Sequence, residues 1–167
     1  MTRRIKVRLS QSSIRNTIRE IQEYEKEILE KTEKFAKRLA DEGVALAKIK
    51  ISQYPAWDTG ELLNSIMNEP GELITNGSQW IIYTGCEYAQ FVEFGTGIVG
   101  EQNPHPDTSL ANWKYDINEH GENGWMYYKD GEWHWTKGMP SRPFMYETAR
   151  DLRDLIPKIA KEVFGGD

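Results

Sequence analysis

Residues 14–39 read IRNTIREIQEYEKEILEKTEKFAKRL, and this stretch decides the fold. Its apolar residues recur at spacings of three, four or seven, so one stripe of a helix is apolar while Glu, Lys and Arg fill the rest: Ile14, Ile18, Ile21, Ile28, Phe35 and Leu39. Serines just upstream are suitable helix caps. The pattern fades by Tyr54-Pro55, because proline biases the preceding residue away from helix. A long amphipathic helix is therefore predicted, with Gly43 as a point where it bends.

Two polar residues, Glu25 and Thr32, interrupt the apolar stripe. A dedicated dimeric coiled coil keeps such seam positions apolar over several heptads. We therefore expect the helix to lie on its own domain or on a neighbouring subunit.

Short extended segments are predicted on both sides of this helix. Apolar and basic residues alternate over 5–9, which is the period of a half-buried strand. Downstream, Leu73-Ile74 and residues 80–83 flank Asn76-Gly77, a dipeptide that favours tight hairpin turns. Residues 98–124 lack apolar periodicity and are expected to form a long loop.

An aromatic hairpin and a closing helix complete the pattern. Residues 125–128 and 132–135 are predicted to be two strands about a tight turn. From about Tyr146 the apolar residues return to helical spacing, and Pro157 is expected to kink or divide that helix. The predicted fold is α+β: a long N-terminal helix and a C-terminal helix packed on a small antiparallel sheet, with the hairpin as an extra. We expect one domain, 1–167, with 98–138 as an elaboration.

Composition is that of a globular protein. The 167 residues are 38% hydrophobic and 28% charged, and no run approaches the roughly 20 apolar residues of a spanning helix. The basic start, residues 1–8, lacks the apolar core of a secretory signal, so the chain is expected to stay where it is made. The single cysteine, Cys86, cannot form an internal disulfide and fits a reducing compartment.

Charge is unevenly distributed along the chain. Residues 1–50 carry 13 basic and 8 acidic residues, a net +5, whereas residues 51–141 carry 3 and 13, a net −10. An acidic surface does not hold phosphates, so general nucleic-acid binding by the middle of the chain is not expected. The basic excess is mixed with Glu along a helix and is interpreted as a solvated face.

Several short motifs resemble catalytic signatures but lie in the wrong context. Residues 95–100 match the glycine spacing of a dinucleotide loop, yet residues 101–106, EQNPHP, follow where a phosphate-binding helix is needed. Asp58-Thr59-Gly60 copies the aspartic-protease tripeptide without apolar strands around it and suits a helix cap better. No serine or cysteine stands in a nucleophile-elbow context. We therefore predict that the protein is not an enzyme.

No cofactor or metal is predicted. Cys86, His105, His120 and His134 lack the two-to-five-residue spacing of structural zinc ligands. The tryptophans and tyrosines of the aromatic hairpin leave one alternative open, a cell-wall or carbohydrate-binding module. A single repeat cannot build the cage that such modules share between neighbours, so cross-strand packing or a subunit contact is favoured.

Three segments, in order, resemble the head-tail joining family of long-tailed bacteriophages, the neck or tail-completion proteins similar to gene product ten of lambdoid phages. Residues 58–66, DTGELLNSI, are similar to the family's Thr-Gly-x-Leu-x-x-Ser-Ile. Residues 88–96, YAQFVEFGT, are similar to its Tyr-Ala-x-x-Val-Glu-x-Gly-Thr. Residues 141–149, SRPFMYETA, are similar to its Arg-Pro-Phe-x-x-x-Ala before a last helix. The stretch 98–138 departs from this frame, being longer and more aromatic.

The resemblance implies a non-enzymatic virion subunit of a phage or prophage. It implies self-association into a ring such as a hexamer and contacts with head-completion or connector and tail proteins. It implies no membrane contact and no sequence-specific nucleic-acid binding, although the genome passes through the ring. The subunit would be present in the host cytoplasm during assembly and then at the head-tail junction or tail. The motif residues expected to pack or form interfaces are Thr59, Gly60, Leu62, Ser65, Ile66, Tyr88, Ala89, Val92, Glu93, Gly95, Thr96, Arg142, Pro143 and Phe144.

The second segment also has the apolar spacing of a short helix. Tyr88, Phe91 and Val92, together with Phe94, are expected to be buried on it, and Gly95-Thr96 to end it. A charge-assisted contact between Glu93 and Arg142 is a further prediction, which competes with both being ordinary surface charges.

Overall fold

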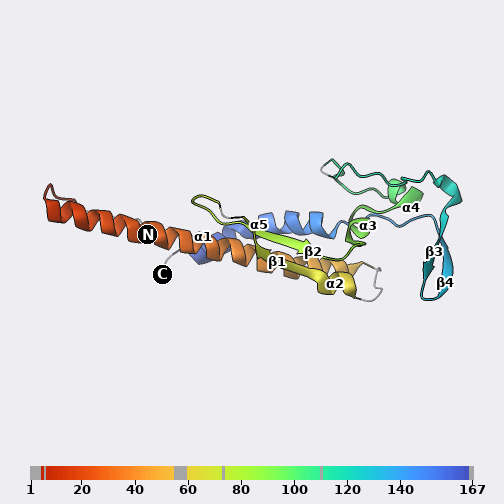
Figure 1. Ribbon diagram of the computed structural model, residues 1–167, viewed down its shortest axis with the longest axis horizontal. Coiled ribbons are helices and arrows are strands. Elements are labelled where there is room, and N and C mark those ends of the chain that lie inside the picture. The colour runs from red at the N-terminus through yellow and green to blue at the C-terminus, as the bar shows by residue number, and fades with distance from the viewer. Residues whose placement is uncertain (1–4, 6, 55–59, 73, 110, 166–167) are drawn as a thin grey trace. The chain divides into compact units, whose positions relative to one another are not determined.

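The computed structural model describes residues 5, 7–54, 60–72, 74–109 and 111–165. The chain divides into two compact units, and Figure 1 labels the helices and strands that belong to them. Unit 1 comprises 1–44, 68–82 and 151–167, and unit 2 comprises 45–67 and 83–150. Two helices and two strands continue from one unit into the other along the chain: α1 (Gln11–Gln53), β1 (Ile66–Pro70), β2 (Trp80–Thr84) and α5 (Phe144–Phe164).

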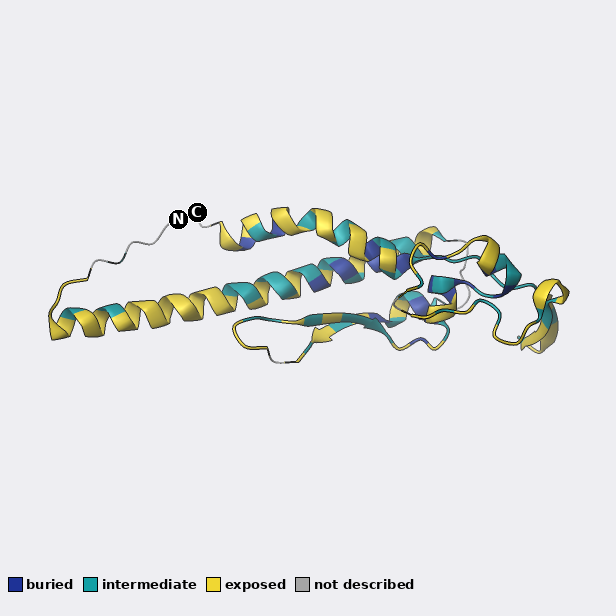
Figure 2. Cartoon of the chain, turned by 90° about the horizontal axis from the view of Figure 1, so that it is seen from above, coloured by how far each residue is buried: buried dark blue, intermediate teal, exposed yellow. Residues whose placement is uncertain are grey.

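Unit 1 contains most of α1, the amphipathic helix predicted from the apolar stripe. The stripe is only partly covered: Figure 2 shows exposed residues over the first half of α1 and burial further along it. Within the unit, Phe35 packs on Phe164 of α5, with ring centroids 5.6 Å apart. Glu33 accepts hydrogen bonds from Ser78 and, at 2.8 Å, from the Trp80 indole. The contacts that hold α1 within unit 1 are therefore made by its later turns.

Gly43 lies inside α1, which continues past it as a single helix of 43 residues. A side chain at this buried glycine would meet Ile82 of β2 and would lie 2.9 Å from the Leu152 side chain of α5. The glycine therefore serves close packing within unit 1. The missing side chain makes room for neighbouring elements, and the predicted bend at Gly43 stays a prediction.

Unit 2 contains the short elements between and around the three sequence motifs. These are α2 (Glu61–Ser65), α3 (Ala89–Phe94), α4 (Gly97–Gln102), the 3-10 turn η1 (Gly121–Asn123), β3 (Trp125–Lys129) and β4 (Glu132–Thr136). Strands β3 and β4 pair antiparallel with Tyr127 opposite His134. Asp130 and Gly131, both with positive φ, form the turn. The predicted aromatic hairpin is confirmed in its bounds to within one residue.

The α+β fold with two long helices, small antiparallel sheets and an extra aromatic hairpin is confirmed. Three details differ. Residues 5 and 7–9 form no strand, and the partner of β2 is β1 instead of residues 73–74, of which Leu73 lies outside the described residues. The predicted loop 98–124 includes most of α4 and all of η1.

Helix α5 is not divided at Pro157, since it runs through that residue as one helix, and a kink there stays a prediction. Proline removes one backbone donor, while Ile159 and Val163 beyond it are buried. The packing of these residues holds the last turns in place. No helix among the described residues is long and apolar enough to cross a membrane.

Candidate functional site: the junction of the three motifs

All three sequence motifs lie in unit 2, and hydrogen bonds connect the second and third. Thr96 and Met139 form an antiparallel bridge, with N–O distances of 2.9 and 3.1 Å. The Arg142 amide donates to the Val92 carbonyl at 2.9 Å, and the Ser141 hydroxyl donates to the Glu93 carbonyl at 2.7 Å. The segment before α5 is therefore fastened along α3.

Glu93 is the centre of this junction. Its side chain comes from α3 and caps the start of α5, where the first backbone amides have no partner within the helix. One carboxylate oxygen accepts from the Met145 amide at 2.8 Å, and the other accepts from the Tyr146 amide at 2.9 Å. Only 7% of Glu93 is exposed. A carboxylate at a helix N-terminus is also favoured by the helix dipole.

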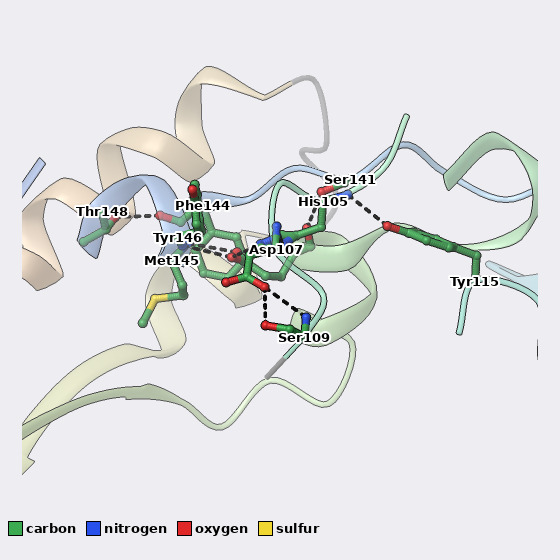
Figure 3. A network of polar contacts seen from close by, with 10 residues as sticks. His105, Asp107, Ser109, Tyr115, Ser141, Phe144, Met145, Tyr146 and Thr148 are labelled. Atoms are coloured by element: carbon green, nitrogen blue, oxygen red, sulfur yellow. Dashed lines mark hydrogen bonds and ion pairs between the residues drawn. The ribbon is translucent and has the colours of Figure 1, made fainter. Parts of the chain in front are cut away.

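His105 completes the partners of Glu93, and Figure 3 shows His105 together with Met145 and Tyr146 in this network. Its Nε2 lies 3.1 Å from the carboxylate oxygen that also accepts from Tyr146. Its Nδ1 accepts from the Asp107 amide at 2.9 Å, so the ring proton must lie on Nε2 and point to Glu93. His105 is 7% exposed, and the rings of Phe94 and Tyr146 lie 4.5 and 5.3 Å away.

The loop that carries His105 is itself held by local hydrogen bonds. Asp107 accepts from the Ser109 amide and hydroxyl at 2.9 and 2.6 Å, and these bonds hold the pKa of Asp107 below its usual value of 3.8. The Tyr115 hydroxyl accepts from the His105 amide at 3.0 Å. These bonds fix the direction of the imidazole.

Glycine is required at two positions of the junction. Gly95 has φ +80°, and a Cβ there would lie 2.6 Å from the Ser141 amide nitrogen. Gly138 has φ +102°, and a Cβ there would collide with the Thr96 carbonyl. The positive φ favours glycine and the close backbone approach requires it.

The first motif is joined to the strand that precedes the second motif. Leu62 and Ile66 are buried at 6% and 1% exposure. The Ser65 and Thr84 hydroxyls lie 2.6 Å apart, and the Thr84 oxygen accepts from the Cys86 amide at 3.1 Å. These bonds place the first motif against the turn that leads into α3.

The predicted motif residues are thus distributed between buried and half-buried positions. Ala89, Val92, Gly95 and Phe144 are buried, whereas Gly60, Tyr88, Thr96 and Pro143 are half-buried. Thr59, together with the predicted Asp58 cap, lies outside the described residues.

Two details of the second motif are corrected. Phe91 is 38% exposed, because the buried face of α3 is formed by Ala89, Val92 and Glu93. The predicted contact between Glu93 and Arg142 is not formed in the described part of the chain, since the Glu93 carboxylate bonds to α5 and His105. Sequence reasoning missed His105, and no signal in the sequence pairs it with Glu93 across twelve residues.

Tyr54 borders the junction and has a shifted pKa. Burial, followed by the Glu147 carboxylate beside its hydroxyl, raises the pKa of Tyr54 to about 12. The raised value means that the folded protein favours the neutral phenol. The resulting stability is fully present below the ordinary tyrosine pKa of about 10 and is lost as pH rises towards 12.

This shift predicts a late-titrating tyrosine. In a spectrophotometric titration of the phenolate absorbance, we expect one group with an apparent pKa of about 12 that disappears in Tyr54→Phe. Tyr128→Phe, at an exposed site on the hairpin, is the matched control and should leave that step in place. Loss of the same step in the control would contradict the assignment.

The described residues contain no group of three or more His, Cys, Asp or Glu side chains placed to hold a metal ion. The arrangement around Glu93 has the chemistry of a structural junction, in which a carboxylate and an imidazole satisfy backbone amides. The fold and site thus define a small α+β protein whose second and third sequence motifs meet to hold a helix in place.

A family model described as "Bacteriophage HK97-gp10, putative tail-component" matches residues 15–95. Residues 15–95 are therefore similar to a bacteriophage tail-component family, which confirms the resemblance predicted from the sequence motifs. The match includes the first motif and most of the second, and the third lies beyond it. No curated protein and no solved structure matches the chain.

Proposed function

We propose that this protein is a non-enzymatic virion subunit that associates with copies of itself into a ring at the head-tail junction of a phage. In this role it is a neck or tail-completion protein and contacts head-completion or connector proteins and tail proteins. The family match supports a tail component, and the motif junction supports a role in packing instead of catalysis. The whole chain acts as one head-tail joining domain in this proposal.

The observation that carries self-association is the apolar surface on the first half of α1. Six large apolar side chains between 38% and 51% exposed lie along residues 14–29: Ile14, Ile18, Ile21, Tyr24, Ile28 and Leu29. Contiguous exposed apolar surface of this kind marks a protein interaction site. We call these six residues the α1 stripe.

Charge supports the same role. The net −10 of residues 51–141 suits a wall that borders a passing polyanionic genome without gripping it. The net +5 of residues 1–50 is suited to acidic patches on a neighbouring subunit. Ring assembly should therefore weaken as salt concentration rises.

A single charge in the α1 stripe tests the proposal. In Ile21→Glu we expect the dissociation constant of the assembly to rise by at least tenfold, because a charge replaces apolar surface that the neighbour would cover, at roughly 2 kcal/mol. Melting temperature should hardly change, since Ile21 is 50% exposed in the subunit. Sedimentation velocity at a series of protein concentrations gives the dissociation constants of the wild type and of Ile21→Glu.

The matched control is Asn16→Glu, which adds the same charge at an exposed position of α1 outside the stripe. It should assemble like the wild type, and negative-stain electron micrographs should show rings for both. A wild-type protein that remains monomeric at every concentration, with no rings in micrographs, would contradict self-association. Equal weakening by the two substitutions would show that charge alone, and not the stripe, governs assembly.

A further inference from the structure

A pocket of about 500 Å³ lies in unit 2 beside the motif junction. Glu93 and the residues that bond to its carboxylate are not part of the pocket lining. Its apolar walls come from α3, from the β3–β4 hairpin and from the segment before α5. The aromatic part of the lining is Tyr88, Trp125 and Tyr127, with Met139 beside it. Two cationic side chains, Arg142 and Lys129, also line it. The pocket therefore combines aromatic surface with positive charge.

The Arg142 backbone is fixed on both sides. Its amide donates to the Val92 carbonyl at 2.9 Å, and its carbonyl accepts from the Phe144 amide at 2.8 Å. Ser141, the residue before it, is tied to α3 through its hydroxyl. The guanidinium thus extends from a backbone segment that is already ordered, so binding a ligand costs no further ordering of that backbone.

The guanidinium itself forms no ion pair within the described part of the chain. Arg142 is half-buried, and this burial lowers its pKa, while Tyr54 shifts the pKa in the opposite direction. Guanidinium remains charged under all ordinary conditions, and its planar donors match a carboxylate in bidentate geometry. A partly desolvated cation without a counter-charge is stabilised by an anionic partner.

Trp125 forms a built wall of the pocket. A Cβ at Gly97 would lie 2.8 Å from the Trp125 ring, so the absence of a side chain there lets the indole lie close to the backbone. The His120 ring packs on the same indole, with centroids 4.9 Å apart. The aromatic wall is therefore held at a fixed place next to Arg142.

We propose that this pocket binds an Asp or Glu side chain, together with an adjacent apolar side chain, from a partner protein subunit. The carboxylate pairs with Arg142, and the apolar neighbour covers the aromatic wall. A nucleic-acid strand is disfavoured, because it carries one negative charge per nucleotide into a region with net −10. The inference deepens the proposed function, on which the identity of the partner as a virion subunit rests.

Two blocked dipeptides test the site directly on the full chain: acetyl-Phe-Glu-amide and its neutral isostere acetyl-Phe-Gln-amide. The readout is the shift of the Trp125 indole N–H resonance during titration. We expect the Glu peptide to bind about tenfold more tightly, as charge-assisted hydrogen bonds to a guanidinium allow. In Arg142→Gln this preference should fall below about twofold, while Arg142→Lys should retain part of it.

Arg150→Gln, at an exposed position on α5, is the matched control and should keep the preference. Melting temperatures of the variants establish that they are folded, and Arg142→Lys keeps the test decisive if Arg142→Gln does not fold. Equal binding of the two peptides by the wild type would overturn the proposal. So would an unchanged preference in Arg142→Gln or tighter binding of an oligothymidylate than of the Glu peptide.

The outcome of the peptide titration is independent of the outcome of the ring-assembly test. Peptide discrimination by a protein that forms no rings would support the pocket and count against the ring subunit. Ring formation without discrimination would support the ring subunit and count against the pocket.

Discussion

Phe144→Ala should lower the free energy of unfolding by about 3 to 5 kcal/mol, because truncation of a fully buried aromatic side chain leaves a cavity. Phe144 is 1% exposed, and it belongs to the third sequence motif at the first turn of α5. Its carbonyl accepts from the Thr148 hydroxyl at 2.7 Å, and Thr148 is also 1% exposed. Denaturant unfolding followed by circular dichroism measures the change.

Phe91→Ala is the matched comparison, since the same atoms are removed from the second motif at a residue that is 38% exposed. Its ring contacts Trp113 edge-on, with centroids 5.8 Å apart. We expect a loss of about 1 to 2 kcal/mol, because much of the ring is already in water. Equal losses from the two substitutions would mean that the start of α5 is not the packed centre of unit 2.

Glu93→Ala should cost about 3 kcal/mol of stability, because the change removes a helix cap and leaves buried donors without an acceptor. The donors are the Met145 and Tyr146 amides and His105 Nε2. Glu93→Gln should cost about 2 kcal/mol, since the amide NH2 would face a backbone N–H that needs an acceptor. Thermal and denaturant unfolding at neutral pH measure both variants.

Glu87→Ala is the matched control, because it removes one carboxylate just before α3, the helix that carries Glu93. Glu87 is exposed, and its removal should change stability by no more than about 0.5 kcal/mol. A Glu93→Gln variant as stable as the wild type would show that the carboxylate is not needed for the cap.

We propose that residues 98–138 are an elaboration of a single domain. The motif junction shows which part of this span contributes to packing. The span supplies His105 to Glu93 and the Trp113 indole, which donates to the Gly95 carbonyl at 3.0 Å. The hairpin part of the span has a different character, with Tyr128, Trp133 and Trp135 more than half exposed. A replacement confined to the hairpin should therefore disturb the fold less than replacement of the whole span.

The sequence by itself determined the features that depend on periodicity and local backbone preference. The three-four-seven spacing of residues 14–39 predicts α1, because a helix places those side chains on one face. The aromatic strands around residues 129–131 predict the β3–β4 hairpin, since a tight turn fixes its pairing locally. The three ordered motifs predict a resemblance to a phage family, and the family model that matches residues 15–95 confirms that resemblance.

Only the tertiary structure decided which side chains meet across long sequence separations. Glu93 bonds to His105 and to amides about fifty residues later, and no local spacing encodes that meeting. The same holds for Gly43, whose missing side chain makes room for Ile82 and Leu152. At Pro157 the local sequence disfavours helix, yet α5 continues. The packing of the buried residues beyond Pro157 outweighs one lost backbone hydrogen bond. Periodicity specifies which face of an element is buried, whereas the partner on that face is set by the chain's path in space.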